Sequence, residues 1–121
     1  MEIQPENGAL AIKGLRELDG ASLRALREAV GAADRLGLPT IEVDLSQVGA
    51  ADAAALGVLA SLYRLVGGRS PLGVAPVRLL NPQPGVQQML ELARMDHLFE
   101  IARRERPETE RALPVDLLQA A

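Results

Sequence analysis

The 121-residue sequence contains no cysteine and no tryptophan, and it has one histidine, one tyrosine and one phenylalanine. Without cysteine, the chain cannot form a disulfide, a thiolate nucleophile or a zinc–thiolate site. The single histidine leaves little material for a catalytic triad or a transition-metal site, and we interpret His97 as a partly exposed residue near a helix end. We therefore expect no enzyme active site, no catalytic residue, no metal and no cofactor.

Excess positive charge is also lacking, because 13 basic residues stand against 16 acidic ones and the net charge is -3. Only Tyr63 and Phe99 could stack on bases, so we do not expect nucleic-acid binding. The sequence does not begin with a basic segment followed by an apolar one, and the apolar run 53–66 is too short to span a bilayer. We expect a cytoplasmic protein without membrane insertion.

The length fits one domain with a single core. We place this domain at residues 1–102 and a C-terminal tail at 103–121. Dense charge at 103–108 indicates that the chain there leaves the core for solvent, and an apolar stretch follows it.

The N-terminal part predicts a β-hairpin followed by a helix. Runs 2–4 and 9–13 flank a turn at 5–8 that contains Asn-Gly, the strongest short hairpin signal. A loop at 14–20 follows, and Ser22 is a plausible N-cap for a helix that ends near glycine 31 or 37. One face of this helix is apolar, which indicates a helix that lies on a sheet.

The centre of the chain, residues 41–57, reads as a buried strand, a tight loop and a helix start. Alternating apolar residues predict a strand at 40–45, and Asp44 and Ser46 at its end are suited to local hydrogen bonds. Asp52 then precedes three alanines that begin an apolar helix at 53–66. Its position just before the helix is that of an N-cap. Since this helix is apolar on nearly all sides, we expect it to pack between the sheet and another element.

The remaining segments complete an α/β pattern. Gly67-Gly68 is expected to end the second helix, 69–76 to form a surface loop, 77–80 a strand, 81–84 the start of a third helix and 98–101 a last short strand. Strands and helices alternating at this spacing predict an α/β fold with a mixed four- to five-stranded sheet and three or more helices mainly on one face.

Several short motifs in this order resemble the STAS domain of anti-sigma factor antagonists (anti-anti-sigma factors). The family's glycine and Leu-Asp before the first helix are matched by Gly14 and Leu18-Asp19, and its Asp-Leu-Ser by residues 44–46. The hallmark Asp-Ser-Ser-Gly-Leu-Gly is similar to Asp52-Ala53-Ala54-Ala55-Leu56-Gly57. Downstream, residues 79–82, 86–92 and 95–99 look like the family's strand, third helix and closing segment. The resemblance covers roughly residues 2–102 and implies a STAS-like fold.

The resemblance also implies a partner and a site. In this family a serine after the hallmark aspartate is phosphorylated by an anti-sigma factor that is itself a kinase, and phosphorylation switches binding off. Ala53 occupies the position of that serine and has no oxygen to phosphorylate. The implied partner is an anti-sigma factor or kinase-type switch protein, bound without phosphate control through a surface centred on 49–57. Its candidate residues are Asp19, Ser22, Gly49, Asp52, Ala53, Ala54, Leu56 and Gly57.

Other interpretations stay open at this point. Asp52 and Asp19 could serve only as capping or turn residues, and the alanines could reflect helix propensity alone. The chain could be a STAS subunit or scaffold of a larger complex, for example in lipid transport or signalling, where constant docking needs no serine. It could also be a small-ligand or nucleotide-binding module, and a homodimer is a further open arrangement.

Overall fold

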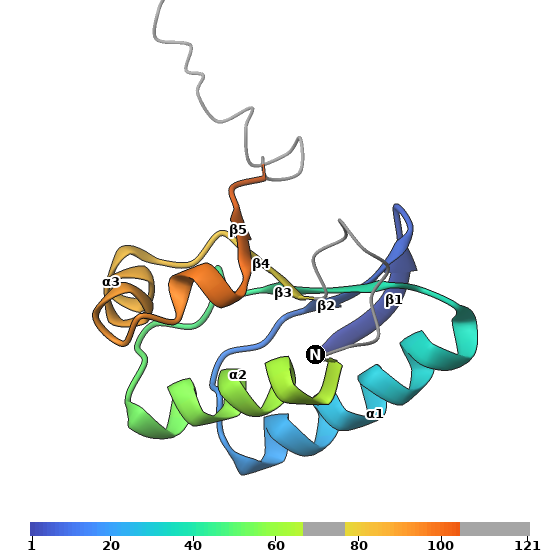
Figure 1. The fold of residues 1–121 in the computed structure, drawn as a ribbon, viewed down its shortest axis with the longest axis horizontal. Helices are drawn as coiled ribbons and strands as arrows, with labels where there is room; N and C mark the ends of the chain where they lie inside the picture. The colour runs from blue at the N-terminus through green and yellow to red at the C-terminus, as the bar shows by residue number, and fades with distance from the viewer. Residues whose placement is uncertain (67–76, 105–121) are drawn as a thin grey trace, which may run out of the picture.

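Five strands form one mixed sheet in the spatial order β1-β2-β3-β4-β5 in the computed structural model of the chain, which describes residues 1–66 and 77–104 (Figure 1). Three α-helices and a short 3-10 helix accompany the sheet. The predicted α/β class, with a mixed sheet of four to five strands, is confirmed.

The N-terminal hairpin pairs β1 (Glu2–Glu6) with β2 (Ala9–Lys13) in antiparallel register. Its turn residues Asn7 and Gly8 have φ angles of 52° and 80°. Two successive positive φ values fit the turn type whose twist matches that of the flanking strands, and Asn-Gly adopts them readily. The hairpin is confirmed, but Pro5 lies in β1 and not in the turn as predicted. A proline is tolerated there because β1 is an edge strand and its missing N–H breaks no interior ladder.

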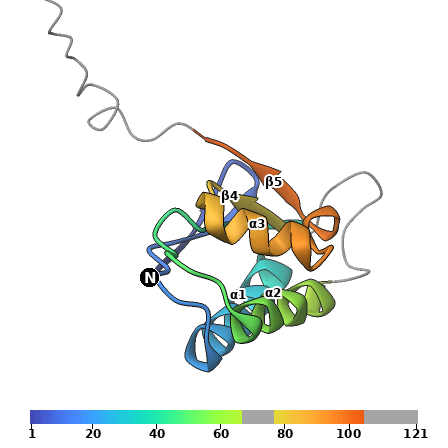
Figure 2. The ribbon, with the colours of Figure 1, turned by 90° about the vertical axis from the view of Figure 1, so that its left-hand side faces the viewer.

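The other strands run parallel to β2. They are β3 (Thr40–Asp44), β4 (Val77–Leu80) and β5 (Glu100–Ala102), and the connections between them carry α1 (Gly20–Leu36), α2 (Ala53–Val66) and α3 (Pro84–Leu92). Parallel strands laid down in sequence order and joined by right-handed crossovers place every connecting helix on the same face. Figure 2 shows this layering, with the helices on one side of the sheet.

The core lies between the sheet and these helices. Side chains from every layer are fully or almost fully buried there, including Leu10 and Ile12 of β2, Leu26 and Val30 of α1, Val43 of β3, Leu59 and Leu62 of α2, and Val86 and Leu90 of α3. The predicted helix 53–66 is confirmed with the same bounds, and it packs on α1 as well as on the sheet. The predicted helix stop at Gly67-Gly68 and the surface loop at 69–76 lie outside the described residues.

The last strand differs from the prediction by about two residues. Leu98 belongs to the 3-10 helix η1 (Asp96–Leu98), and β5 follows at Glu100. In the two described ranges no helix has the length and apolar character that crossing a membrane requires.

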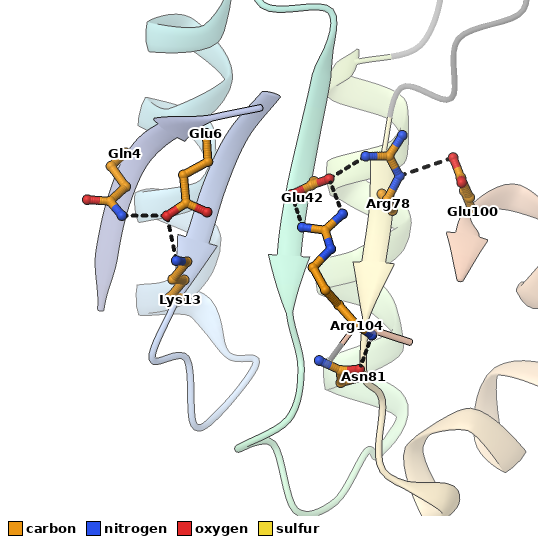
Figure 3. Close-up of polar contacts among 8 residues, drawn as sticks. All are labelled: Gln4, Glu6, Lys13, Glu42, Arg78, Asn81, Glu100 and Arg104. Atoms are coloured by element: carbon orange, nitrogen blue, oxygen red, sulfur yellow. Dashed lines mark hydrogen bonds and ion pairs between the residues drawn. The ribbon is translucent and has the colours of Figure 1, made fainter. Parts of the chain in front are cut away.

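The face of the sheet opposite the helices carries a charged cluster, defined here as Glu42, Arg78, Glu100 and Arg104 (Figure 3). Glu42 in the central strand is 1% exposed and is ion-paired with Arg78 of β4. The two Nη atoms of Arg104 donate to the two carboxylate oxygens of Glu42, each over 2.9 Å. The Nε atom of Arg78 lies 3.1 Å from Glu100. This charged cluster is held together by its own pairs.

The charged cluster corrects one prediction from the sequence. Residues from 103 onward were expected to leave the core for solvent, yet Arg104 bonds to the buried Glu42, and Arg103 donates to the backbone oxygen of Pro82 over 2.5 Å. An arginine side chain can lay its apolar stem across the sheet while its guanidinium pairs with a carboxylate. Arg104 is therefore part of the folded unit.

Candidate functional site

A depression of about 490 Å³ lies where α1 and α2 begin, at the carboxyl ends of β2 and β3. In parallel sheets the loops that follow the strands meet at this end, so segments far apart in sequence come together there. The depression is lined by Arg16, Glu17, Leu18, Asp19, Gly49, Ala50, Ala51, Asp52, Ala54 and Ala55. The predicted contact residues Asp19, Gly49, Asp52 and Ala54 are therefore brought together on one surface.

Asp19 is the N-cap of α1 and forms a capping box with Ser22. The backbone N–H of Ser22 donates to Asp19 Oδ1 over 3.0 Å, and the backbone N–H of Asp19 donates to Ser22 Oγ over 2.7 Å. The hydrogen bond from the Ser22 backbone lowers the pKa of Asp19. The prediction that Ser22 is the N-cap is wrong, because Ser22 stands at the third helical position and Asp19 takes the cap.

Ser22 is 7% exposed, so its hydroxyl serves the capping box from inside the molecule. It offers a partner little surface of its own. The predicted contact role of Ser22 remains a prediction, and the structure assigns this residue the task of fixing Asp19.

Asp52 is the N-cap of α2, as the sequence predicts. Its Oδ1 accepts the backbone N–H of Ala55 over 2.9 Å, and its carbonyl oxygen accepts that of Leu56 over 3.0 Å. Beyond it, Ala53, Ala54 and Gly57 are exposed and Leu56 is half-buried. The first turn of α2 therefore presents a smooth strip of small side chains beside an acidic cap.

The loop between β3 and α2, residues 46–52, is attached to the body of the protein at its start. Leu45 donates its backbone N–H to Leu80 of β4 over 2.8 Å, and Val48 is fully buried and donates to Leu45 over 3.0 Å. The backbone N–H of Ser46 donates to Asp44 Oδ1 over 2.9 Å, which confirms the predicted local hydrogen bonding of these two residues.

Gln83 also holds this loop, a role that was not predicted from the sequence. Its Nε2 donates to the carbonyl oxygen of Ser46 over 2.8 Å, across a separation of 37 residues. A side-chain bond over such a separation has no local sequence pattern. The weak signal available was a polar residue between two prolines at the start of a helix.

The surface of the depression is acidic. Glu17, Asp19 and Asp52 outnumber Arg16 around the depression, so its rim carries a net negative charge. Asp19 and Asp52 both accept helix N–H groups. Across the ranges 1–66 and 77–104 no group of three or more histidine, aspartate or glutamate side chains is arranged to hold a metal ion. His97, in η1, is exposed and does not line the depression.

Solved structures of anti-sigma factor antagonists share this fold. A Thermotoga maritima protein proposed as one of them superposes with a TM-score of 0.64 at 19% identity, over 95% of this chain and 93% of that chain. SpoIIAA, a Bacillus cell fate determinant, gives 0.61 in its phosphorylated form at 16% identity, over 93% of this chain and 97% of that one. An anti-sigma factor antagonist of Mycobacterium paratuberculosis gives 0.59 at 23% identity, over 93% and 88%.

At these identities the structural likeness shows the fold alone. None of the curated proteins matches the chain. The model of the family described as "Mlab, STAS domain" matches residues 1–101, which is most of the sequence. Together with the sheet order and the motif positions, this match shows that the chain belongs to the STAS domain family.

Proposed function

We propose that the chain is a non-enzymatic regulatory module that binds an anti-sigma factor or kinase-type switch protein through the depression where α1 and α2 begin. The observation that carries this proposal is the meeting of the Leu18-Asp19 segment and the 49–55 segment around one hollow. SpoIIAA, which shares the fold, is described both as an anti-sigma factor antagonist and in a phosphorylated form. A regulatory partner is therefore the first one to test.

The proposed binding is constitutive. A phosphate at a helix N-terminus is well tolerated, because free backbone N–H groups and the helix dipole favour negative charge there. The same charge beside Asp52 in an interface would repel an acidic partner. In a closely packed interface it would also have to be desolvated, which costs free energy. Ala53, Ala54 and Ala55 cannot accept a phosphate, so this chain has the surface without the hydroxyl that would switch it off.

The two carboxylates of this surface, Asp19 and Asp52, are placed for helix capping, which favours a binding role over catalysis. A general acid or base must be free to exchange a proton with a substrate at hydrogen-bond distance. Asp52 and Asp19 each use Oδ1 to accept a backbone N–H group, of α2 and α1 respectively. These residues shape a binding surface.

A second candidate function is that of a STAS subunit in a larger assembly, such as a lipid-transport or signalling complex. The three alanines at the start of α2 favour it equally well, because a permanently docked subunit has no use for a phosphorylation site. The two candidates differ in the partner and share the surface.

Site-specific photo-cross-linking in the native lysate tests both. A photoreactive amino acid at position 53, which is exposed between the lining residues Asp52 and Ala54, reports on partners at the edge of the depression. One at position 4, exposed on β1 at the other face of the sheet, serves as the matched control. We expect position 53, and not position 4, to capture an ATP-binding anti-sigma factor kinase. Capture of a transport or scaffold subunit at position 53 would favour the second candidate. Specific capture at position 4 alone would refute docking through the depression.

A further inference from the structure

We propose that Gln83, at the start of α3, is a positioning residue for the binding loop, defined here as residues 46–52. Its importance for binding rests on the function proposed above, whereas its action on the loop does not. The starting observation is that a helix-capping position is used for something other than capping.

Gln83 is the N-cap residue of α3, with extended backbone angles, but its side chain makes no hydrogen bond to its own helix. Helix starts normally need such a bond, because their first N–H groups lack partners. Here Pro84 takes the first helical position and has no N–H, which removes one of those groups. The side-chain amide of Gln83 makes no bond to its own helix and is left free to bond elsewhere.

This side-chain amide reaches the binding loop. Gln83 Nε2 donates to Ser46 O over 2.8 Å, and Gln83 is half-buried. Ser46 lies between Leu45, which is tied to β4, and the exposed stretch Gly49-Ala50 on the rim of the depression. The bond therefore fixes the loop just before the residues that would meet a partner.

Gln83 has a firm base from which to act. The turn before it is bonded to the end of β5, since Asn81 donates its backbone N–H to Ala102 over 2.8 Å and accepts that of Arg104 at Oδ1 over 2.8 Å. Arg103 adds bonds to Pro82 O and to Gln87 Oε1, each over 2.5 Å. The end of β5 and the binding loop are thus joined through this turn.

Amide hydrogen exchange on the full chain tests the positioning role without any partner. Gln83→Met keeps the length of the side chain and removes the donor, and Gln88→Met on the exposed side of α3 is the matched control. We expect the Val48 amide to exchange about fivefold faster in Q83M, the factor that corresponds to one lost hydrogen bond, with the α1 amides that exchange by local opening unchanged. Gln83→Lys, which retains a donor at similar reach, should restore slow exchange.

The outcomes separate a local role from a general one. Equal exchange of Val48 in Q83M and Q88M would overturn the proposal. A uniform rise over these locally opening α1 amides and the loop would also overturn it, because Gln83 would then not act on the loop in particular.

Binding of the partner captured at position 53 supplies the second arm. Ordering a loop on binding costs free energy and so lowers the affinity. We therefore expect the Kd to rise about twofold to fivefold in Q83M and to stay unchanged in Q88M. Faster exchange with an unchanged Kd would leave the positioning role intact and would contradict docking through this loop. The two failures are therefore distinguishable.

Discussion

At the residue scale, Asp52 combines two tasks that depend on the same atoms. Its carboxylate closes the start of α2 and also forms part of the acidic rim of the depression. The N-cap role is a property of the fold, whereas the contact role is proposed. Variants that retain capping but change charge can separate them.

Replacing Asp52 with alanine should lower the free energy of unfolding by about 1 kcal/mol, because an N-cap oxygen is lost. Asp52→Asn keeps an acceptor oxygen and should lower the free energy of unfolding by only about 0.3 kcal/mol. Urea unfolding of both variants measures the difference. Equal stability of the alanine and wild-type chains would contradict the capping role.

Glu42 is the residue whose environment the sequence least revealed. It sits at a polar position in an alternating strand and is nevertheless 1% exposed. Hydrogen bonds from Arg104 hold the pKa of Glu42 below the usual glutamate range. Burial acts in the opposite direction, and the hydrogen bond from Arg78 adds to the lowering. The buried carboxylate is stable because two guanidinium groups neutralise it.

Glu42→Gln should lower the free energy of unfolding by about 3 kcal/mol at neutral pH, since Arg104 loses its carboxylate partner and Arg78 keeps only Glu100. A lowered folded-state pKa stabilises the protein fully above the unfolded-state pKa, and that contribution is lost as pH falls through the folded-state value. The gap between wild type and variant should therefore narrow on acidification.

Urea unfolding between neutral pH and about pH 3 measures this gap. Glu28→Gln, on the exposed side of α1, is the control and should show a difference within about 0.5 kcal/mol. A gap for E42Q that is independent of pH would contradict the role given to the Glu42 carboxylate.

At the scale of elements, periodicity and turn chemistry predicted most of the secondary structure. α2 and β4 have the predicted bounds because an uninterrupted apolar helix and a short apolar strand carry strong signals. The α1 cap was misassigned because Asp19 and Ser22 are both good N-caps three residues apart, and only the backbone angles decide between them. The attachment of the segment after β5 was missed because charge suggested solvent where Arg104 pairs with Glu42.

The segment that follows β5 is attached to the middle of the sheet by the two hydrogen bonds from Arg104 to Glu42. Arg104→Met in the full chain should lower the free energy of unfolding by about 2 kcal/mol, the value of hydrogen bonds to a charged group. Arg24→Met on α1, where the arginine is exposed, is the matched control and should change it by about 0.5 kcal/mol or less.

Thermal or urea unfolding compares the two arginine variants. If R104M proved no less stable than R24M, residue 104 would lie functionally outside the folded unit, as the sequence first suggested. The expected result instead extends the unit beyond residue 102.

At the scale of the whole molecule, the order of the strands determines where function can lie. Sequential parallel strands put α1, α2 and α3 on one face, so the charged cluster lies on the opposite face, and the helix starts gather at one end. The fold class and the gathering of Asp19 with Asp52 were predictable from motif order. The pairing of Glu42 with Arg78 and Arg104 was not, because these residues are 36 and 62 positions apart and no local pattern links them.

The central claim is that this end of the molecule docks a switch partner and cannot be switched off by phosphate. The most direct measurement is the Kd for the partner captured at position 53, determined before and after the complex is incubated with ATP and magnesium. Ala53→Ser, which restores the hydroxyl, is measured beside the wild type. We predict an unchanged Kd and no phosphate on the wild-type chain, with a weakened, phosphorylated A53S. A wild-type chain that gains phosphate and loses affinity would contradict the account.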